Sequence, residues 1–265
     1  MAKETDMDKQ IEHLRSSWEN EEFQKKHAEA RNLVIRTLRE LNGFYIAKTG
    51  YGFTRFVESR MKTPESICGK LQRKGRPVDF KTATEVLNDI SGVRCICYSV
   101  KEIYWIAHQI GKDSRFQIIK AKDYIRKPKK NGYESYHMIL EVPVLNGDEE
   151  KIVPVELQLR TIVMDAWASM DTRISYKKKK NLPLEEERRI KKYAKLGKHL
   201  DCLIQETMAH NAADRKAGMS PDEWAAQQEL AELFLEQRRK EWRSLQKKQS
   251  KHQDKSKKKQ QGKSK

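Results

Sequence analysis

The 265-residue chain lacks long apolar runs, and this excludes a membrane-spanning protein. Hydrophobic residues make up 37% of the chain and charged residues 35%. No apolar run approaches the ~20 residues that a membrane-spanning helix needs. The first ten residues are polar and mixed in charge, so the apolar segment of a secretion signal is also missing. We expect neither a membrane protein nor an exported one.

Cysteine is scarce as well. The four cysteines are too few and too scattered for a disulfide framework or a four-cysteine zinc site. Cys95 and Cys97 form a C-x-C pair inside a segment with the pattern of a buried strand, and no second Cys or His pair stands at a ligand-like spacing. This usage fits a reducing compartment, and we expect a cytoplasmic protein.

Two common nucleotide-binding motifs are missing. The chain has no G-x-x-x-x-G-K-[ST], so any use of ATP does not involve a P-loop. Gly50-Tyr51-Gly52 is not completed to G-x-G-x-x-G, because Arg55 stands at the final position.

Positive charge, by contrast, is abundant. Lys and Arg number 55 against 38 Asp and Glu, which gives a net charge of +17. Residues 247–265 hold nine lysines, one aspartate and no apolar residue, so about half of the excess lies in a tail that should be disordered. Such a tail binds polyanions such as RNA in a salt-sensitive way, or it only keeps the chain soluble.

The apolar pattern predicts a mixed α/β core between two helical parts. Residues 8–41 have the stripe of a long helix, which the glycine-rich and aromatic segment 42–53 should end. The other predicted helices begin at Thr63-Pro64 and span 100–110, 161–177, 184–209 and 221–247, and the predicted strands are 56–62, 92–98, 116–121, 136–144 and 151–160. Asn146-Gly147 favours a hairpin between the last two strands. We therefore expect an α+β fold in which helices flank a mixed central sheet of about five strands.

Alternation along the predicted strands places several polar side chains on one face. In residues 151–160, Glu156, Gln158 and Arg160 share a face, and the preceding strand turns His137 away from its own apolar side. An acid, an amide and a guanidinium together suit a metal-bound, phosphorylated ligand. The alternative is that this face meets solvent, as in many antiparallel sheets.

The loop 122–137 (KDYIRKPKKNGYESYH) combines cations with aromatic rings. It places five lysines and arginines around tyrosines, an Asn-Gly turn and a histidine. Cations pair with phosphate and an aromatic ring stacks on a base, so the loop suits a nucleotide. The alternative is a solvated basic loop.

The segment 58–70 (ESRMKTPESICGK) has the features of an anion site. Arg60 and Lys62 stand on a predicted strand directly before a helix that Thr63 caps and whose first turn carries Ser66. Lys70 lies one turn further along the same face. A helix N-terminus next to cations binds anions.

Taken in chain order (58–70, 122–137 and 151–160), with NDISGVR between the first and the second, these three segments resemble the RelA/SpoT-type nucleotidyl pyrophosphokinase domain, and more narrowly the stand-alone small alarmone synthetases. The matching stretch runs from Ser59 to Lys177, and its motifs are SRMKTPESICGK, NDISGVR, KDYIRKPKKNGYESYH, VPVELQLRT and MDAWASM. The resemblance implies a nucleotidyltransferase-like fold and transfer of the β,γ-pyrophosphate of ATP to the 3′-hydroxyl of GDP or GTP. The products would be AMP and the alarmones ppGpp or pppGpp of the stringent response. The resemblance also implies Mg²⁺ as cofactor and a homotetramer.

The resemblance assigns roles to twelve residues. Asp89 and Glu156 would be catalytic carboxylates and magnesium ligands, with Glu156 also the base near the attacking hydroxyl. ATP would contact Arg60, Lys62, Ser66, Lys70 and Arg94, with the two arginines on either side of the adenine. The acceptor guanosine nucleotide would contact Lys129, Asn131, Tyr133, His137 and Gln158, with Tyr133 stacked on the guanine.

The chain departs from the family pattern in three places. The family usually has Y-R-S-L-H or Y-Q-S-L-H, whereas Glu134 follows Tyr133 here and puts an acid beside an anion site, unless strand parity turns it away. Lys130 replaces a usual proline and adds charge to the acceptor loop. Residues 170–172 (MDT) replace L-E-H, which weakens any role carried over there.

Four parts of the chain follow from this assignment. They are an N-terminal helical segment (1–54), the synthetase core (55–180), C-terminal helices suited to oligomerisation (181–246) and the tail (247–265). The chain has no His-Asp dipeptide, the metal-binding signature of the hydrolase domain in longer relatives, so we expect synthesis without hydrolysis.

Two other functions stay open. A toxic relative of the same fold would move pyrophosphate onto the 3′ end of tRNA or onto an adenosine nucleotide, and the basicity and Glu134 would suit it. A catalytically silent RNA-binding protein would use the tail, although the intact set of Asp89, Glu156, Arg94 and Tyr133 argues against it.

Overall fold

The computed structural model describes residues 6–146, 149–175 and 183–213. The predicted helix at 221–247, the lysine-rich tail and Gly147 of the predicted hairpin lie outside the described residues. Within the described part, no helix is long and apolar enough to cross a membrane.

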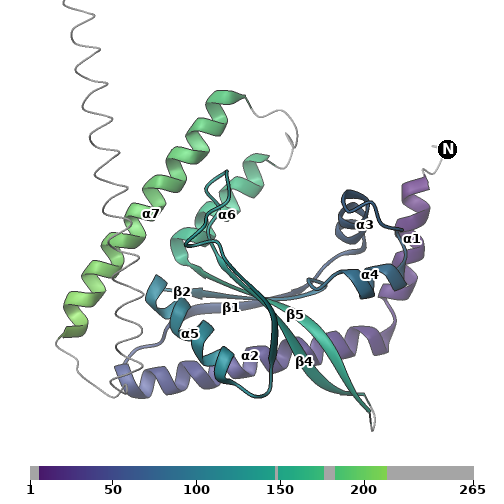
Figure 1. Cartoon of the computed structure of the whole chain (residues 1–265), viewed down its shortest axis with the longest axis horizontal. Coiled ribbons are helices and arrows are strands. Elements are labelled where there is room, and N and C mark those ends of the chain that lie inside the picture. Colours follow the sequence, from purple (N-terminus) through teal and green to yellow (C-terminus); the bar gives the residue numbers. More distant parts are fainter. Residues whose placement is uncertain (1–5, 147–148, 176–182, 214–265) are drawn as a thin grey trace, which may run out of the picture.

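Five strands form one mixed sheet in the order β1-β2-β5-β4-β3 (Figure 1). The strands are β1 (Thr54–Met61), β2 (Ser91–Cys97), β3 (Gln117–Asp123), β4 (Tyr136–Asn146) and β5 (Glu149–Thr161). β2 and β5 are parallel, and the other neighbours are antiparallel. The predicted α+β class and all five predicted strands are confirmed, with ends that shift by a few residues.

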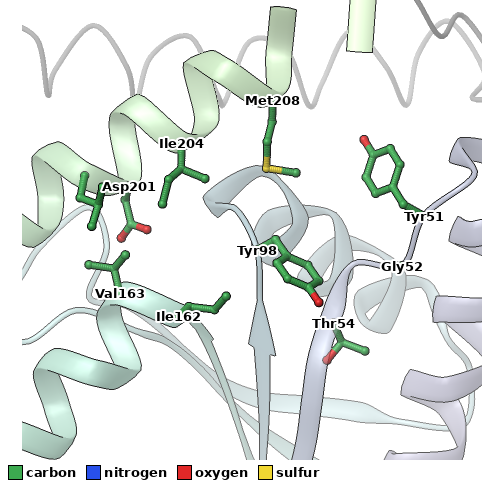
Figure 2. A pocket seen from close by; sticks show the side chains of 10 residues that line it. Tyr51, Gly52, Thr54, Tyr98, Ile162, Val163, Asp201, Ile204 and Met208 are labelled. Atoms are coloured by element: carbon green, nitrogen blue, oxygen red, sulfur yellow. The ribbon is translucent and has the colours of Figure 1, made fainter. Parts of the chain in front are cut away.

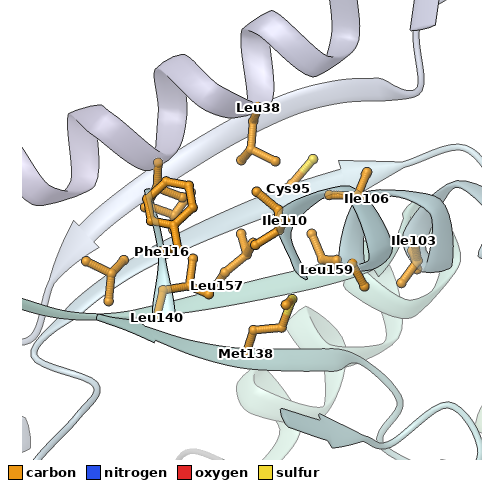
Figure 3. Close-up of a cluster of buried hydrophobic side chains, with 14 of the residues drawn as sticks. Leu38, Cys95, Ile103, Ile106, Ile110, Phe116, Met138, Leu140, Leu157 and Leu159 are labelled. Carbon is orange, nitrogen blue, oxygen red and sulfur yellow. The ribbon is translucent and has the colours of Figure 1, made fainter. Parts of the chain in front are cut away.

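Alternation along the strands gives the sheet an apolar face and a polar face. On the apolar face, buried side chains of β2, β4 and β5 pack against helices α2 (Glu21–Thr49) and α5 (Val100–Lys112). Figure 3 shows Leu38 of α2, Ile106 of α5 and Leu157 of β5 in this cluster, and each is fully buried. Burial of a side chain of this size contributes ~1.5–3 kcal/mol. Glu156 and Gln158, which alternate with the buried residues of β5, consequently point to the opposite face.

The N-terminal helix prediction is wrong at two points. The single helix predicted at 8–41 is two helices, α1 (Asp6–Trp18) and α2, because the Asn20 side chain accepts a hydrogen bond from Phe23 N and caps a new helix. α2 then continues through Gly43 to Thr49 and ends at Gly50, whose φ of 80° only glycine adopts at low cost. Burial of Tyr45 against the core outweighs the weak helix propensity of this segment.

A smaller apolar cluster holds the N-terminal helices against the start of β2. It joins α1 to α3 (Pro64–Arg73) and to α4 (Phe80–Val86), a short helix that the sequence did not predict. The Asp79 side chain caps α4 by accepting from Thr82 N at 2.7 Å. The predicted cap at Thr63 is confirmed, with Pro64 in the first turn of α3. This unit fixes the loop 87–90, which leads from α4 into β2.

Two further helices follow β5, and Figure 1 shows them side by side. They are α6 (Ile162–Ser175) and α7 (Leu184–Ala213), and a third apolar cluster of Trp167, Ala168, Ile190 and Ala194 joins them. Tyr133 packs against the same cluster. The loop between β3 and β4 is therefore supported by the α6–α7 pair.

Candidate active site

Two cavities open on the polar face of the sheet, and Asp89 and Glu156 line both of them. The first cavity, of about 240 Å³, is rich in cations and rings, with Lys70, Lys74, Lys120, Lys122, Tyr124, Lys129 and His137 in its wall. The second, of about 50 Å³, is lined mainly by Glu58, Ser59, Arg60, Gly92, Arg94 and Gln158. Two ligands bound in these cavities would meet at the same pair of carboxylates.

Glu156 lies in the middle of β5, opposite Gly92 of the parallel strand β2. Its Oε1 lies 3.1 Å from His137 Nδ1, and its Oε2 accepts a hydrogen bond of 2.7 Å from Gln158 Nε2. Burial raises the pKa of Glu156, but the interactions with His137 and Gln158 outweigh it and hold the pKa below its usual value. The carboxylate is therefore ionised at neutral pH.

Asp89 precedes β2 and is held by two lysines. Its Oδ2 lies 2.9 Å from Lys62 Nζ and 2.5 Å from Lys70 Nζ. Burial raises the pKa of Asp89, and the two lysines more than reverse this effect, so the net pKa is lowered. The Asp89 Oδ1 atom is buried and has no hydrogen-bond partner among the described residues.

The second cavity contains the two predicted arginines on neighbouring strands. In the antiparallel register of β1 and β2, Arg60 faces Gly92 and Arg94 faces Glu58. Burial lowers the pKa of the Arg94 guanidinium, whose Nη1 lies 3.4 Å from Asp165 Oδ1. The guanidinium groups of these two arginines are of the kind that stacks on a flat ring.

The resemblance also predicts that Lys62 and Ser66 contact ATP, and the structure places only Lys62 near the two carboxylates. Lys62 reaches the site through its contact with Asp89. Ser66 is exposed at the start of α3, where its hydroxyl accepts a hydrogen bond of 3.1 Å from Thr63 Oγ1, and it lies outside both cavities.

A chain of hydrogen bonds connects Glu156 to the predicted acceptor residues. The Tyr133 hydroxyl lies 2.8 Å from His137 Nε2 and accepts from Arg160 Nη2 at 2.8 Å. His137 therefore connects Tyr133 to Glu156, with Nε2 facing the phenol and Nδ1 facing the carboxylate. Arg160 also donates to Gln158 Oε1 at 3.0 Å, so this network fixes both neighbours of the carboxylate.

Lys129 and Asn131 take different positions in the same loop. Lys129 lines the first cavity, with Nζ 4.5 Å from the ring centroid of Tyr133 and 4.9 Å from that of Tyr124. Asn131 lies outside both cavities, because its Nδ2 donates to Asp171 Oδ2 of α6 at 3.2 Å and its Oδ1 accepts from Tyr133 N. Asn131 therefore braces the loop. Tyr133 stands behind Lys129 and His137, outside the lining of the cavity.

Several residues of the site were not among the twelve to which the resemblance assigned a role. Lys120, Lys122 and Tyr124 line the first cavity, and Arg160 organises the hydrogen-bond network. The two lysines are two residues apart on β3, so the alternation that singled out β5 would have placed them on one face too. The role of Arg160 depends on Tyr133, a contact between distant residues that no local pattern reveals.

Asp89 and Glu156 are the residues that could hold a divalent cation. They line the same two cavities, and the charge of Asp89 acts to raise the pKa of Glu156. No cluster of three or more His, Cys, Asp or Glu side chains occurs within the described ranges. Two carboxylates, one of them with the unpartnered Oδ1 of Asp89, fit a hard cation that takes its remaining ligands from phosphate and water.

A larger cavity lies elsewhere in the described part of the chain. It has a volume of about 600 Å³ and is bounded by the start of β1, residues near the end of β2 and the face of α7 (Figure 2). Its wall is mainly apolar, and Asp201, the one charged side chain in it, accepts a hydrogen bond from Thr161. Its lining contains no Lys, Arg or His side chain that could bind phosphate.

Comparisons with known sequences agree with the site. Residues 59–181 match the model described as "Region found in RelA / SpoT proteins". The chain is 39% identical over 152 residues to GTP pyrophosphokinase YwaC of Bacillus subtilis, which covers 57% of this chain and 72% of the relative. It is 30% identical over 164 residues to GTP pyrophosphokinase YjbM of the same organism, over 62% of this chain and 76% of the relative.

Solved structures give the same result. Small alarmone synthetase 1 of Bacillus subtilis superposes with a TM-score of 0.67 at 27% identity, over 75% of this chain and 99% of the other. Small alarmone synthetase 2 of that organism superposes with a TM-score of 0.63 at 33% identity, over 74% and 99%. One structure of synthetase 1 contains its product pppGpp, with a TM-score of 0.66 at 27% identity and a coverage of 76% and 99%. By motif order, fold and sequence identity, the chain belongs to the RelA/SpoT family.

Proposed function

We propose that this protein is a GTP pyrophosphokinase that transfers the β,γ-pyrophosphate of ATP to the 3′-hydroxyl of GDP or GTP. The products are AMP and the alarmones ppGpp or pppGpp. The observation that carries the proposal is the pair of cavities that share Asp89 and Glu156. A reaction between two nucleotides requires such an arrangement, because donor and acceptor must meet at one reacting centre.

The smaller cavity suits the adenosine part of ATP. Arg60 and Arg94 present guanidinium planes that stack on a base. Lys62 and Lys70, which contact Asp89 in the structure, lie where the phosphates of ATP would enter and would exchange this carboxylate for phosphate oxygens. Ser66 would approach ATP only if α3 shifted, so its role has the least support.

The larger cavity suits the acceptor. Lys120, Lys122 and Lys129 provide charge for the 5′-phosphates, Tyr124 provides a ring near the base, and Tyr133 supports Lys129 from outside the cavity. Glu156 would accept the proton of the 3′-hydroxyl, while His137 and Gln158 hold its carboxylate in place. The 3′-oxygen then bonds to the β-phosphorus as the bond from that phosphorus to the α,β-bridging oxygen breaks, and the bridging oxygen leaves with AMP.

Asp89 and Glu156 would hold Mg²⁺, which neutralises the charge of the phosphate oxygens when bound. The unpartnered Asp89 Oδ1 supports this assignment. Direct binding is testable by calorimetry with Mg²⁺ and a non-hydrolysable ATP analogue, in which Asp89→Asn should weaken the metal-dependent part of the binding.

The toxic and RNA-binding alternatives gain no support. Glu134, which kept the first of them open, is turned toward α7 and contacts Lys198, away from the acceptor cavity. The deciding experiment incubates the protein with labelled ATP, Mg²⁺ and one acceptor at a time: GDP, GTP, ATP or tRNA. We expect label on GDP and GTP, whereas label on tRNA alone or on no acceptor would refute the proposal.

We also propose the homotetramer, the cytoplasmic location and the division at residues 54, 180 and 246. The stripe of Tyr193, Leu196, Leu200 and Leu203 on α7 is 44–48% exposed, which supports assembly through the C-terminal helices. The four cysteines are free thiols, as a reducing compartment favours. Light scattering after gel filtration should give four times the mass of one chain, and Leu200→Glu should reduce it.

A further inference from the structure

Residue 134 is a place where the chain departs from its family, and the structure shows what its carboxylate contacts. Glu134 is 5% exposed and lies between the acceptor loop and α7. Lys198 of α7 places Nζ 2.8 Å from Glu134 Oε1, and its side chain is only 16% exposed. Breaking a pair this buried leaves a charge without compensation, so the contact resists separation of the loop from α7.

Gly132 brings the same loop into direct contact with the helix backbone. Its φ is 94°, and a Cβ atom there would stand 2.4 Å from Ala194 Cβ. Trp167 of α6 packs beside Tyr133, with ring centroids 6.3 Å apart. Residues 132–134 therefore pack directly against the α6–α7 pair. At Gly132, no side chain separates the loop backbone from α7.

Neighbours of Gly132 and Glu134 in the same loop belong to the acceptor side of the site. The Tyr133 hydroxyl bonds to His137, and the Tyr133 carbonyl accepts from Lys129 N at 3.1 Å. Ser135 fixes the other end of the segment, because its Oγ donates to Leu159 O. A displacement of Glu134 would thus move Lys129, Tyr133 and His137 together.

α7 is tied independently to the strand that carries Glu156. Asp201 lies one turn beyond Lys198, and its Oδ2 accepts a hydrogen bond of 2.9 Å from Thr161 Oγ1 at the end of β5. The same Thr161 hydroxyl accepts a hydrogen bond from Met164 N and so caps the start of α6. One face of α7 therefore contacts the acceptor loop through Lys198 and the catalytic strand through Asp201.

We infer that α7 is a positioning element for the acceptor nucleotide, and that Glu134 and Lys198 are positioning residues that set the affinity for GDP and GTP. This inference rests on the proposed function. The ion pair fixes the distance between the acceptor loop and β5. This distance in turn sets the position of the guanine and the 3′-hydroxyl relative to Glu156. The ATP cavity is lined by residues of β1, β2 and β5 and by Asp89, and neither Glu134 nor Lys198 contributes to it.

The test compares steady-state kinetics with GDP and ATP varied separately. Lys198→Met removes one charge, and Glu134→Lys combined with Lys198→Glu reverses the pair. We expect Lys198→Met to raise the KM for GDP by about tenfold to a hundredfold, the loss of affinity that one missing stacking or charged contact with the nucleotide would cause. The KM for ATP and kcat at saturating GDP should change little. The reversed pair should restore most of the GDP affinity, and Lys195→Met, at an exposed position of the same helix, should match the wild type.

Equal increases in KM for GDP and ATP, or no recovery by the reversed pair, would overturn the inference. If Lys198→Met does not fold, Lys198→Gln and Glu134→Gln are compared with Lys195→Met in the same way. If the wild type transfers no pyrophosphate, the proposed function fails, and hydrogen exchange still tests the ion pair. Amides of residues 129–135 should then exchange faster in Lys198→Met than in Lys195→Met, and equal rates would refute the positioning role.

Discussion

Gly132→Ala tests the contact between the acceptor loop and α7 most directly. A methyl group at this position would stand 2.4 Å from Ala194 Cβ, which is too close for two non-bonded carbon atoms. The φ of 94° is also unfavourable for an L-amino acid with a side chain. The backbone conformation costs ~1–2 kcal/mol. Overpacking against a helix costs ~1–3 kcal/mol more. We expect the free energy of unfolding to fall by about 3 kcal/mol.

Gly75→Ala provides the matched control. Gly75 also has a positive φ, 62°, but nothing lies within 4 Å of its would-be Cβ. This substitution should therefore lower the free energy of unfolding only by the cost of the backbone conformation, ~1 kcal/mol. The difference between the two variants isolates the steric contact with α7.

A double-mutant cycle separates the two contributions further. Ala194→Gly removes the methyl group that Gly132→Ala would strike, at the expense of ~1 kcal/mol of helix propensity. In the double variant the steric part should disappear, which gives a coupling energy of ~1–3 kcal/mol. Urea denaturation followed by circular dichroism measures all four proteins. Equal losses at positions 75 and 132, or strictly additive effects of the two substitutions, would refute the reasoning.

Three further outcomes are expected. Glu156→Gln should lower turnover by ~10²–10⁴-fold in the labelled-ATP assay with an unchanged melting temperature, and retained turnover would contradict its role as base. Tyr133→Ala should raise the KM for GDP, because the Tyr133 ring supports Lys129 in the wall of the acceptor cavity, whereas Tyr133→Phe keeps that ring and should leave the KM nearly unchanged. Burial raises the pKa of Glu102 to about 7 from 4.5, so the folded protein holds this proton more tightly. The bound proton stabilises the folded protein fully at a pH below the pKa of Glu102 in the unfolded chain. This stabilisation, ~3 kcal/mol in the free energy of unfolding, is lost as the pH rises through 7. Glu102→Gln, which mimics the neutral acid, should be the more stable protein at pH 8 in urea denaturation, with a gap that narrows toward pH 5.

The sequence alone determined the features that depend on neighbouring residues. Alternation along β5 separated buried Leu157 from Glu156 on the polar face, and the structure has both as predicted. Thr63 and Pro64 marked the start of α3. Strand parity left open whether Glu134 faces the acceptor, and its contact with Lys198 shows that it does not. The order of several separated motifs identified the family before any contact was visible.

Tertiary structure alone decided the contacts between distant residues. α2 continues through Gly43 because Tyr45 is buried in the core, an energy that local propensity does not contain. Asp89 obtains its partners Lys62, which directly follows β1, and Lys70 of α3 only after the sheet and the α1–α3 cluster have formed. Pairing of buried charges depends on geometry in three dimensions, whereas strand faces and helix caps depend on residues within one turn or one pleat. This physical difference explains why the sequence named the two carboxylates but not the contacts that hold them and the acceptor loop in place.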